Sequence, residues 1–186
     1  YVALCGTFPH GFDVRMFNSL DFNGKHVFVD AIDDIDGLLE KGVDLLKINM
    51  QEYCKLLERM SIPLVKSSPQ FWKMTATAVL ERLPIKNLVV TDEDSPVRAF
   101  RLVEKKFQGI QLQPASINVK NDIGAGDSFF AGWLYACDLG LSFESCLAKA
   151  TAVACARCEV ERPWNLSLDR VVELENELAT KVERLE

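Results

Sequence analysis

Positive charge is scarce in this sequence of 186 residues, which has 21 lysine and arginine residues against 27 aspartate and glutamate residues. The formal net charge of -6 is spread along the chain, which argues against nucleic acid or an anionic membrane surface as the main partner. Apolar runs long enough to span a membrane are also missing, so we expect no membrane association. Any phosphate-binding site must therefore be a local feature of the chain.

Paired metal-ligand motifs are lacking as well. Cys155 and Cys158 form one Cys-x-x-Cys pair, but the sequence has no second pair and no histidine nearby, which disfavours a zinc or redox site. The six cysteines lie mostly in apolar or helical contexts, as expected for buried thiols in a reducing compartment. No signal peptide is recognisable, and a cytoplasmic protein is expected. The start inside a strand-like run suggests a fragment or a processed chain.

Short apolar runs alternate with amphipathic stretches in the first half of the chain. The runs predicted as strands are residues 2–5, 26–31, 45–49 and 87–91. The stretches with helical spacing are residues 12–20, 35–41, 51–60 and 71–83. This order predicts successive βα units and an α/β fold with a parallel sheet, whose ligands bind at the carboxyl ends of the strands.

The second half of the chain has a different pattern. Residues 98–112 are predicted as a β-hairpin or a short antiparallel extension, with its turn near residues 107–109, and no strand is expected after it. Three helices are predicted, at residues 124–138, 143–158 and 168–185, and the last begins behind Ser167 as its N-cap. With 48% hydrophobic residues, the chain can bury a core without disulfides. We therefore expect a single domain over residues 1–186.

The most informative segment is a glycine turn that enters the helix predicted from residue 124. The backbone amides of Gly124, Ala125 and Gly126 can point at one anion, and the helix dipole adds positive potential there. Asp127 follows in the first helical turn, where its carboxylate could accept the proton of an attacking hydroxyl. In isolation such a motif is also explained by a helix cap and by tight packing at the glycines.

The surrounding residues favour the chemical interpretation. The run Asn-Asp-Ile-Gly-Ala-Gly-Asp-Ser-Phe at residues 121–129 resembles the signature of the ribokinase/PfkB family of sugar kinases. Residues 6–11 resemble the family's acceptor-facing Gly-Ser-Leu-Pro-Pro-Gly segment, and residues 47–52 resemble its Lys-Pro-Asn-x-x-Glu segment. Residues 88–91 resemble the strand entering the nucleotide site, and residues 149–162 the helix beside the adenine. The resemblance covers nearly the whole chain.

This resemblance implies a doubly wound, mostly parallel, ribokinase-like sheet flanked by helices, without the family's lid and amino-terminal part. It implies transfer of the terminal phosphate of ATP, with Mg2+, to a hydroxyl of a small-molecule sugar or sugar phosphate. Asp127 would be the base, and the amides of Gly124, Ala125 and Gly126 the anion hole. Glu52 would hold the metal through water. The implied ATP-binding residues are Asn49, Glu52, Thr91, Asn121, Gly124 and Gly126.

The sequence also departs from the family pattern. Three acidic residues, at positions 92–94, follow Thr91 where relatives continue with glycines, and they would repel a polyphosphate. The resemblance also implies an amino-terminal part that grips the sugar and that has no counterpart in this sequence. The expected partners are therefore a second copy in a homodimer, or the missing amino-terminal part. Two hypotheses follow: a sugar or sugar-phosphate kinase, and a non-catalytic or partner-dependent kinase-like subunit that has lost sugar binding. Magnesium-dependent hydrolysis or transfer of ATP would separate them.

Overall fold

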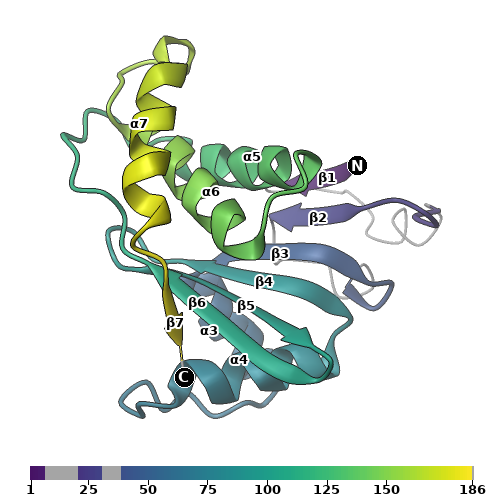
Figure 1. Cartoon of the computed structure of the whole chain (residues 1–186). Coiled ribbons are helices and arrows are strands. Elements are labelled where there is room, and N and C mark those ends of the chain that lie inside the picture. Colours follow the sequence, from purple (N-terminus) through teal and green to yellow (C-terminus); the bar gives the residue numbers. More distant parts are fainter. Residues whose placement is uncertain (7–20, 31–38, 186) are drawn as a thin grey trace. The chain divides into compact units, whose positions relative to one another are not determined.

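The computed structural model of the chain describes residues 1–6, 21–30 and 39–185. Within these residues, seven strands form a mixed, mostly parallel sheet whose spatial order follows the chain (Figure 1). The strands are β1 (Val2–Cys5), β2 (Val27–Asp30), β3 (Val43–Asn49), β4 (Ile85–Thr91), β5 (Val97–Val103), β6 (Lys106–Leu112) and β7 (Glu183–Leu185). The predicted helix at residues 12–20, most of the one at residues 35–41 and most of the acceptor-like segment 6–11 lie outside the described residues.

Helices flank the sheet, as the α/β prediction requires. They are α3 (Met50–Arg59), α4 (Phe71–Arg82), α5 (Ala125–Asp138), α6 (Phe143–Cys158) and α7 (Leu168–Ala179), with a short 3-10 helix η1 (Pro163–Asn165). Among the described residues, none of these helices combines the length and the apolar character needed to cross a bilayer.

The chain divides into two compact units. The first comprises Tyr1–Val90, Ala99–Gly109 and Leu185–Glu186, and the second comprises Thr91–Arg98 and Ile110–Arg184. The prediction of one domain over residues 1–186 stays a prediction.

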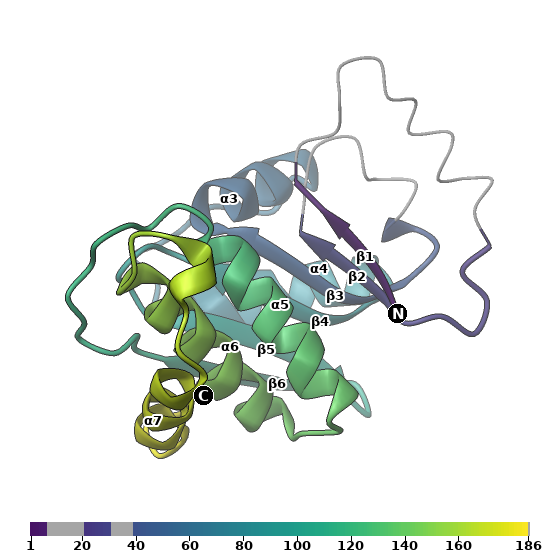
Figure 2. The same ribbon diagram turned by 90° about the horizontal axis from the view of Figure 1, so that it is seen from above.

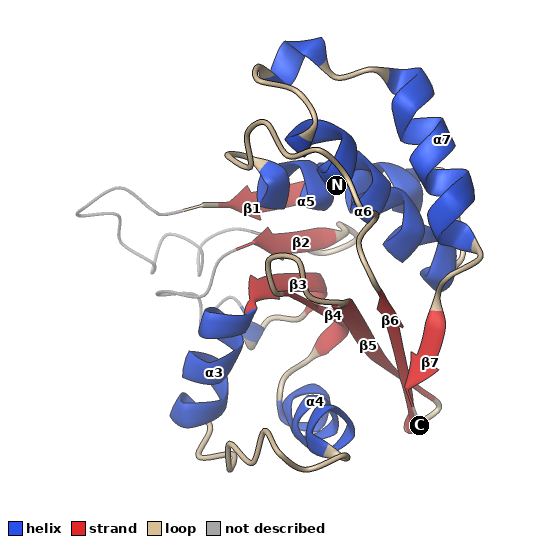
Figure 3. Cartoon of the chain, turned by 90° about the vertical axis from the view of Figure 1, so that its left-hand side faces the viewer, coloured by secondary structure: helices blue, strands red, loops and turns tan. Residues whose placement is uncertain are grey.

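Parallel pairing organises the first unit. Strand β1 pairs with β2 in the register Val2 to Val27, and β2 pairs with β3 in the register Phe28 to Leu45. Residues Val27 to Val29 of β2 are apolar and buried, and five of the seven residues of β3 are buried, as expected for strands inside a parallel sheet. Figure 3 shows α3 and α4 on the same side of strand β3. In this unit the predicted strands are confirmed, and so are the two predicted helices that fall within the described residues, α3 and α4.

An aromatic stack fills the core of the first unit. The ring of Trp72 on α4 lies between Tyr53 on α3, at 5.6 Å, and Phe100 on β5, at 5.8 Å, and both pairs are stacked. Tyr53 also donates a hydrogen bond of 2.7 Å to the hydroxyl of Thr75, which donates in turn to the carbonyl of Phe71. Burial raises the pKa of Tyr53. The stack and the hydroxyl pair therefore fix the relative orientation of α3 and α4.

The three long helices of the second unit pack in chain order, with α6 between α5 and α7 (Figures 1 and 2). Gly132 makes the close approach of α5 and α6 possible. A Cβ atom at this position would lie 3.0 Å from both the Cα atom of Ala150 and the Cγ2 atom of Val153. The predicted helix at residues 143–158 is confirmed residue for residue.

Two boundaries of the sequence prediction are wrong. The hairpin turn lies at Glu104 and Lys105, both with left-handed φ angles of 50° and 64°, which suits a two-residue hairpin loop. Gly109 is instead inside β6, where a Cβ atom would come within 2.7 Å of the Phe107 ring. The helix predicted over residues 168–185 ends at Ala179, because the chain then enters strand β7 next to β6. Main-chain pairing with a sheet edge outweighed the helical spacing of the apolar residues.

Candidate active site

The glycine turn of the second unit forms the start of α5. Gly124 is the N-cap residue and has a left-handed φ of 82°, which a residue with a side chain rarely adopts. The amide of Ala125 already donates to the carbonyl of Asp122 at 3.0 Å. By contrast, the amides of Gly124 and Gly126 donate to no other described residue. Two of the three amides predicted for the anion hole are therefore available to a ligand.

Asp127 lies in the first turn of α5 and is exposed. Its side chain does not cap the helix, and it forms no ion pair with any residue in the described part of the chain. Its Oδ2 atom lies 4.0 Å from the position that a Cβ atom on Gly124 would occupy. The carboxylate is thus placed beside the glycine turn rather than used to end the helix.

Asn121 holds the loop that leads into this turn. Its side-chain amide donates to the carbonyl of Glu161 at 2.9 Å, and its side-chain oxygen accepts from the amide of Ile123 at 2.9 Å. The amides of Lys120 and Asn121 both donate to the carbonyl of Cys158. Asn121, predicted as a cofactor-binding residue, is therefore engaged in shaping the loop.

Asn49 and Glu52 belong to the first unit, where they start α3. The Asn49 side chain accepts from the amide of Glu52 at 2.9 Å, and the Glu52 carboxylate accepts from the amide of Asn49 at 2.7 Å. This reciprocal pair is a capping box. Because a single oxygen of Glu52, Oε2, carries the bond to Asn49, its other oxygen can still face a hydrated ion.

Thr91 ends β4 in the second unit and is half-buried. The acidic segment that follows it turns back on itself, with the amide of Ser95 donating to the carbonyl of Asp92 at 2.8 Å. Burial lowers the pKa of the nearby Arg98 guanidinium, and the Asp92 carboxylate opposes this effect. The positive charge of Arg98 thus offsets part of the negative charge of residues 92–94 within the same unit.

A comparison with protein families places these features in a known context. The model of the pfkB family carbohydrate kinases matches residues 3–167, most of the chain. The chain belongs to this family. The match includes both segments described above, the capping box that starts α3 and the glycine turn that starts α5.

Solved structures share the fold of this pfkB-family chain. Phosphofructokinase-2 from Escherichia coli, in complex with substrates and products, matches with a TM-score of 0.79 and 19% identity over 95% of this chain and 56% of that one. The complex of the same enzyme with fructose-6-phosphate matches with a TM-score of 0.76 and 18% identity, over 95% of this chain and 55% of that one. Ribokinase from Arabidopsis thaliana, complexed with ribose and ATP, matches with a TM-score of 0.68 and 22% identity, over 87% of this chain and 51% of that one. The ribokinase-like fold is confirmed.

The chain spans only a little over half the length of these solved structures, 56% in the first case. No curated protein matches the sequence. Family and fold are therefore established by the family model and by the solved structures.

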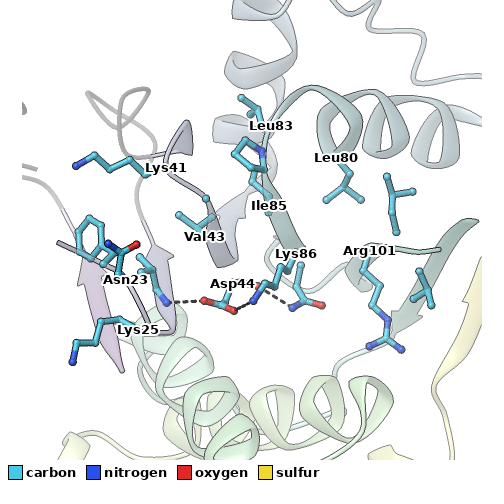
Figure 4. Close-up of a pocket in the computed structure, with 18 of the residues that line it drawn as sticks. Asn23, Lys25, Lys41, Val43, Asp44, Leu80, Leu83, Ile85, Lys86 and Arg101 are labelled. Carbon is cyan, nitrogen blue, oxygen red and sulfur yellow. Dashed lines mark hydrogen bonds and ion pairs between the residues drawn. The ribbon is translucent and has the colours of Figure 1, made fainter. Parts of the chain in front are cut away.

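The pfkB-family chain also contains a cavity of about 1140 Å³ in the first unit. Figure 4 shows Val43 and Ile85 lining it, close to Asp44. Asp44 accepts from Lys86 at 2.6 Å and from the amide of Val27 at 2.8 Å. Burial acts to raise the pKa of Asp44, but hydrogen bonds from Lys86, the Val27 amide and His26 hold it below its ordinary value. The cavity lies at the amino-terminal ends of β2 to β4, so it includes none of the predicted site residues.

Three charged side chains in or beside the predicted segments are largely buried, and the sequence analysis gave none of them a role. Lys47 on β3 donates to both carboxylate oxygens of Asp30, at the end of β2, at 2.9 Å, and the two side chains are 8% and 11% exposed. Arg157, in the last turn of α6, is 3% exposed. The signal for the pair of Asp30 and Lys47 was an aspartate at the end of a buried apolar strand. Arg157 gave no signal, since an arginine near a helix end is usually at the surface.

Proposed function

We propose that this protein transfers the terminal phosphoryl group of ATP to a hydroxyl of a sugar or sugar phosphate. The observation that supports the proposal most strongly is the start of α5, where a left-handed Gly124 leaves amides available beside an exposed Asp127. Membership in a family of carbohydrate kinases supports the same reaction class.

The proposed reaction gives each of these groups a role. The hydroxyl oxygen of the acceptor attacks the terminal phosphorus of ATP, the bond from that phosphorus to the bridging oxygen breaks, and ADP leaves. Asp127 takes the hydroxyl proton, so the products are a phosphate ester, ADP and one proton. The amides of Gly124 and Gly126 stabilise negative charge on the transferring group, aided by the positive end of the α5 dipole. Ala125 contributes through the shape of the turn, because its amide is bonded to Asp122.

In this proposal magnesium would bind together with ATP, through the phosphates of the nucleotide. Within the described residues there is no cluster of three or more histidine, cysteine, aspartate or glutamate side chains that could hold a metal ion. Mg2+ often binds through one carboxylate, water and substrate phosphates, and it neutralises phosphate charge there. Glu52 would hold it through water with the oxygen that the capping box leaves available. Asn49 and Thr91 would contact the nucleotide, and Asn121 would act through the loop that it holds.

The solved relatives suggest which acceptors to test first. Phosphofructokinase-2 from Escherichia coli has been solved with fructose-6-phosphate, and ribokinase from Arabidopsis thaliana with ribose and ATP. We therefore propose a sugar phosphate or a free sugar as acceptor.

Calorimetric titration of the purified protein with magnesium-ATP tests the proposal, and it is repeated with fructose 6-phosphate and with ribose present. We expect micromolar binding, and ADP formation that depends on the acceptor. No binding under any of these conditions would contradict the proposal and favour a non-catalytic or partner-dependent subunit. Binding without ADP formation would restrict the proposal to nucleotide recognition.

A further inference from the structure

Arg157 is a buried cation in the second unit. Its side chain is 3% exposed, and a buried charge usually has an ionic partner because its desolvation is unfavourable. Its guanidinium instead donates to two carbonyl groups, of Val160 at 2.9 Å and of Asn121 at 3.4 Å. No carboxylate of a described residue forms a salt bridge with it. The described hydrogen bonds of Arg157 therefore go to neutral carbonyl groups.

The guanidinium faces the glycine turn. Its Nε atom lies 3.8 Å from the position that a Cβ atom on Gly124 would occupy, and the Asp127 Oδ2 atom lies 4.0 Å from that same position. The absence of a side chain at Gly124 therefore leaves a small space that the cation and the proposed base both approach to within 4.0 Å. A phosphoryl group held by the turn would be close to both.

The end of α6 also supports the loop before the turn. The Cys158 carbonyl accepts from the amides of Lys120 and Asn121, at 2.8 and 3.2 Å, and the Glu161 carbonyl accepts from the Asn121 side chain. Arg157 adds a bond to the Asn121 carbonyl from the same region. Loss of its guanidinium would therefore remove one support of the loop and a buried positive charge beside it.

We propose that Arg157 is a positioning residue for phosphoryl transfer, which fixes the Asn121 to Gly124 loop and places a buried positive charge behind the anion turn. This inference rests on the proposed function. A purely structural alternative is that Arg157 only satisfies carbonyls at the end of α6. The two roles differ in what they predict for a variant that keeps the volume of the side chain and loses its charge.

The experiment compares Arg157→Met, Arg157→Lys and a matched control, Arg170→Met, in the purified protein. Arg170 is in the same unit and holds Glu159 near the end of α6 with two bonds, of 2.7 and 2.9 Å, but it does not bond to the loop. For Arg157→Met we expect a loss of about 100-fold in kcat/KM for magnesium-ATP, as for removal of one donor from an anion hole. We expect Arg157→Lys to recover at least tenfold of this loss, and Arg170→Met to stay within about threefold of the wild type.

Chemical rescue of Arg157→Ala distinguishes loss of the guanidinium charge from loss of folding. Arg157→Ala should regain at least about tenfold in rate with added methylguanidinium, whereas Arg170→Ala should not respond. This comparison also applies if Arg157→Met fails to fold. Rates of Arg157→Met within threefold of the wild type, an equal loss in Arg170→Met, or an absence of rescue would each overturn the inference.

Binding of pyrophosphate, measured by equilibrium dialysis, separates this inference from the proposed function. If the wild type binds pyrophosphate without catalysing transfer, and Arg157→Met binds it at least tenfold more weakly, the proposed reaction fails and the role of Arg157 at the turn stands. If the wild type transfers phosphate and Arg157→Met matches it in transfer and in pyrophosphate binding, only the inference fails. If the wild type neither transfers phosphate nor binds pyrophosphate, both fail.

Discussion

Helices α3 and α5 start in opposite ways. At the start of α3, in the first unit, the side chains of Asn49 and Glu52 bond to each other's amides, so the helix end satisfies itself. At the start of α5, in the second unit, the cap is Gly124, which has no side chain, and amides are left without a partner in the described chain. A helix end that is already satisfied contributes stability, whereas one that is left open can bind an anion. The comparison therefore predicts different consequences for mutations at the two ends.

The largest expected effect is on catalysis at the start of α5, the helix end that is left open. Asp127→Asn should lower phosphoryl transfer by about 100- to 10,000-fold, because the amide cannot accept the hydroxyl proton. The unfolding midpoint should be nearly unchanged, since Asp127 is exposed and does not cap α5. Steady-state rates with magnesium-ATP and thermal unfolding measure the two quantities. Asp122→Asn, an exposed carboxylate in the same loop, is the control, and equal rates for both variants would remove Asp127 from the mechanism.

The second test asks whether the open end needs glycine. Gly124→Ala should lower the free energy of unfolding by about 1–2 kcal/mol, since its φ of 82° is unfavourable for alanine. It should also weaken binding of magnesium-ATP, because the methyl group would lie within 4.0 Å of both Arg157 and Asp127. Gly140→Ala is a matched control, with a φ of 67° and no atom within 4 Å of the new methyl group. Equal ATP affinity in the two variants would contradict the anion-binding role of the turn.

Loss of the cap at the start of α3 should lower stability. Asn49→Ala removes the side-chain acceptor for the Glu52 amide and should lower the free energy of unfolding by about 1 kcal/mol. Urea unfolding measures this change. Asn49→Asp, which retains a capping oxygen, should restore most of the loss. If Asn49→Ala is as stable as the wild type, the capping box does not stabilise α3.

The smallest change in stability is expected for Glu52→Gln. This variant distinguishes the capping role of Glu52 from its proposed role with magnesium. Glu52→Gln keeps an oxygen that can accept from the Asn49 amide, so the free energy of unfolding should change by less than about 0.5 kcal/mol. Loss of the negative charge should nevertheless raise the magnesium concentration required for half-maximal transfer. Rates measured over a magnesium series would show this. An unchanged magnesium requirement would leave Glu52 with a capping role alone.

The sequence predicted the parts of the fold that local patterns determine. The apolar runs of β2 and β3, the start of α3 and the whole of α6 follow from spacing and capping residues, and the structure has them within two residues. The last helix was predicted too long, because strand β7 depends on a neighbouring strand edge. Gln111 on β6 donates to Glu183 on β7 at 2.9 Å, a contact between residues far apart in the sequence.

The same distinction applies to the candidate site. The glycine turn and Asp127 are recognisable because their residues are consecutive, whereas Asp30 and Lys47 meet only when β2 lies beside β3. The burial of Arg157 likewise depends on a loop 36 residues earlier in the chain. Roles assigned to single residues, including Thr91 and Asn121, stay predictions until the variants are measured.

The aromatic stack of the first unit has a spectroscopic consequence. Trp72 is held between two rings there, Trp133 is 1% exposed in the second unit, and Trp164 is 76% exposed. Near-ultraviolet circular dichroism depends on such fixed, asymmetric ring environments, so we expect Trp72 and Trp133 to contribute strongly and Trp164 weakly. Replacing Trp133 with phenylalanine would leave Trp72 as the main tryptophan signal, and the loss of tertiary order in the first unit could be followed optically by itself.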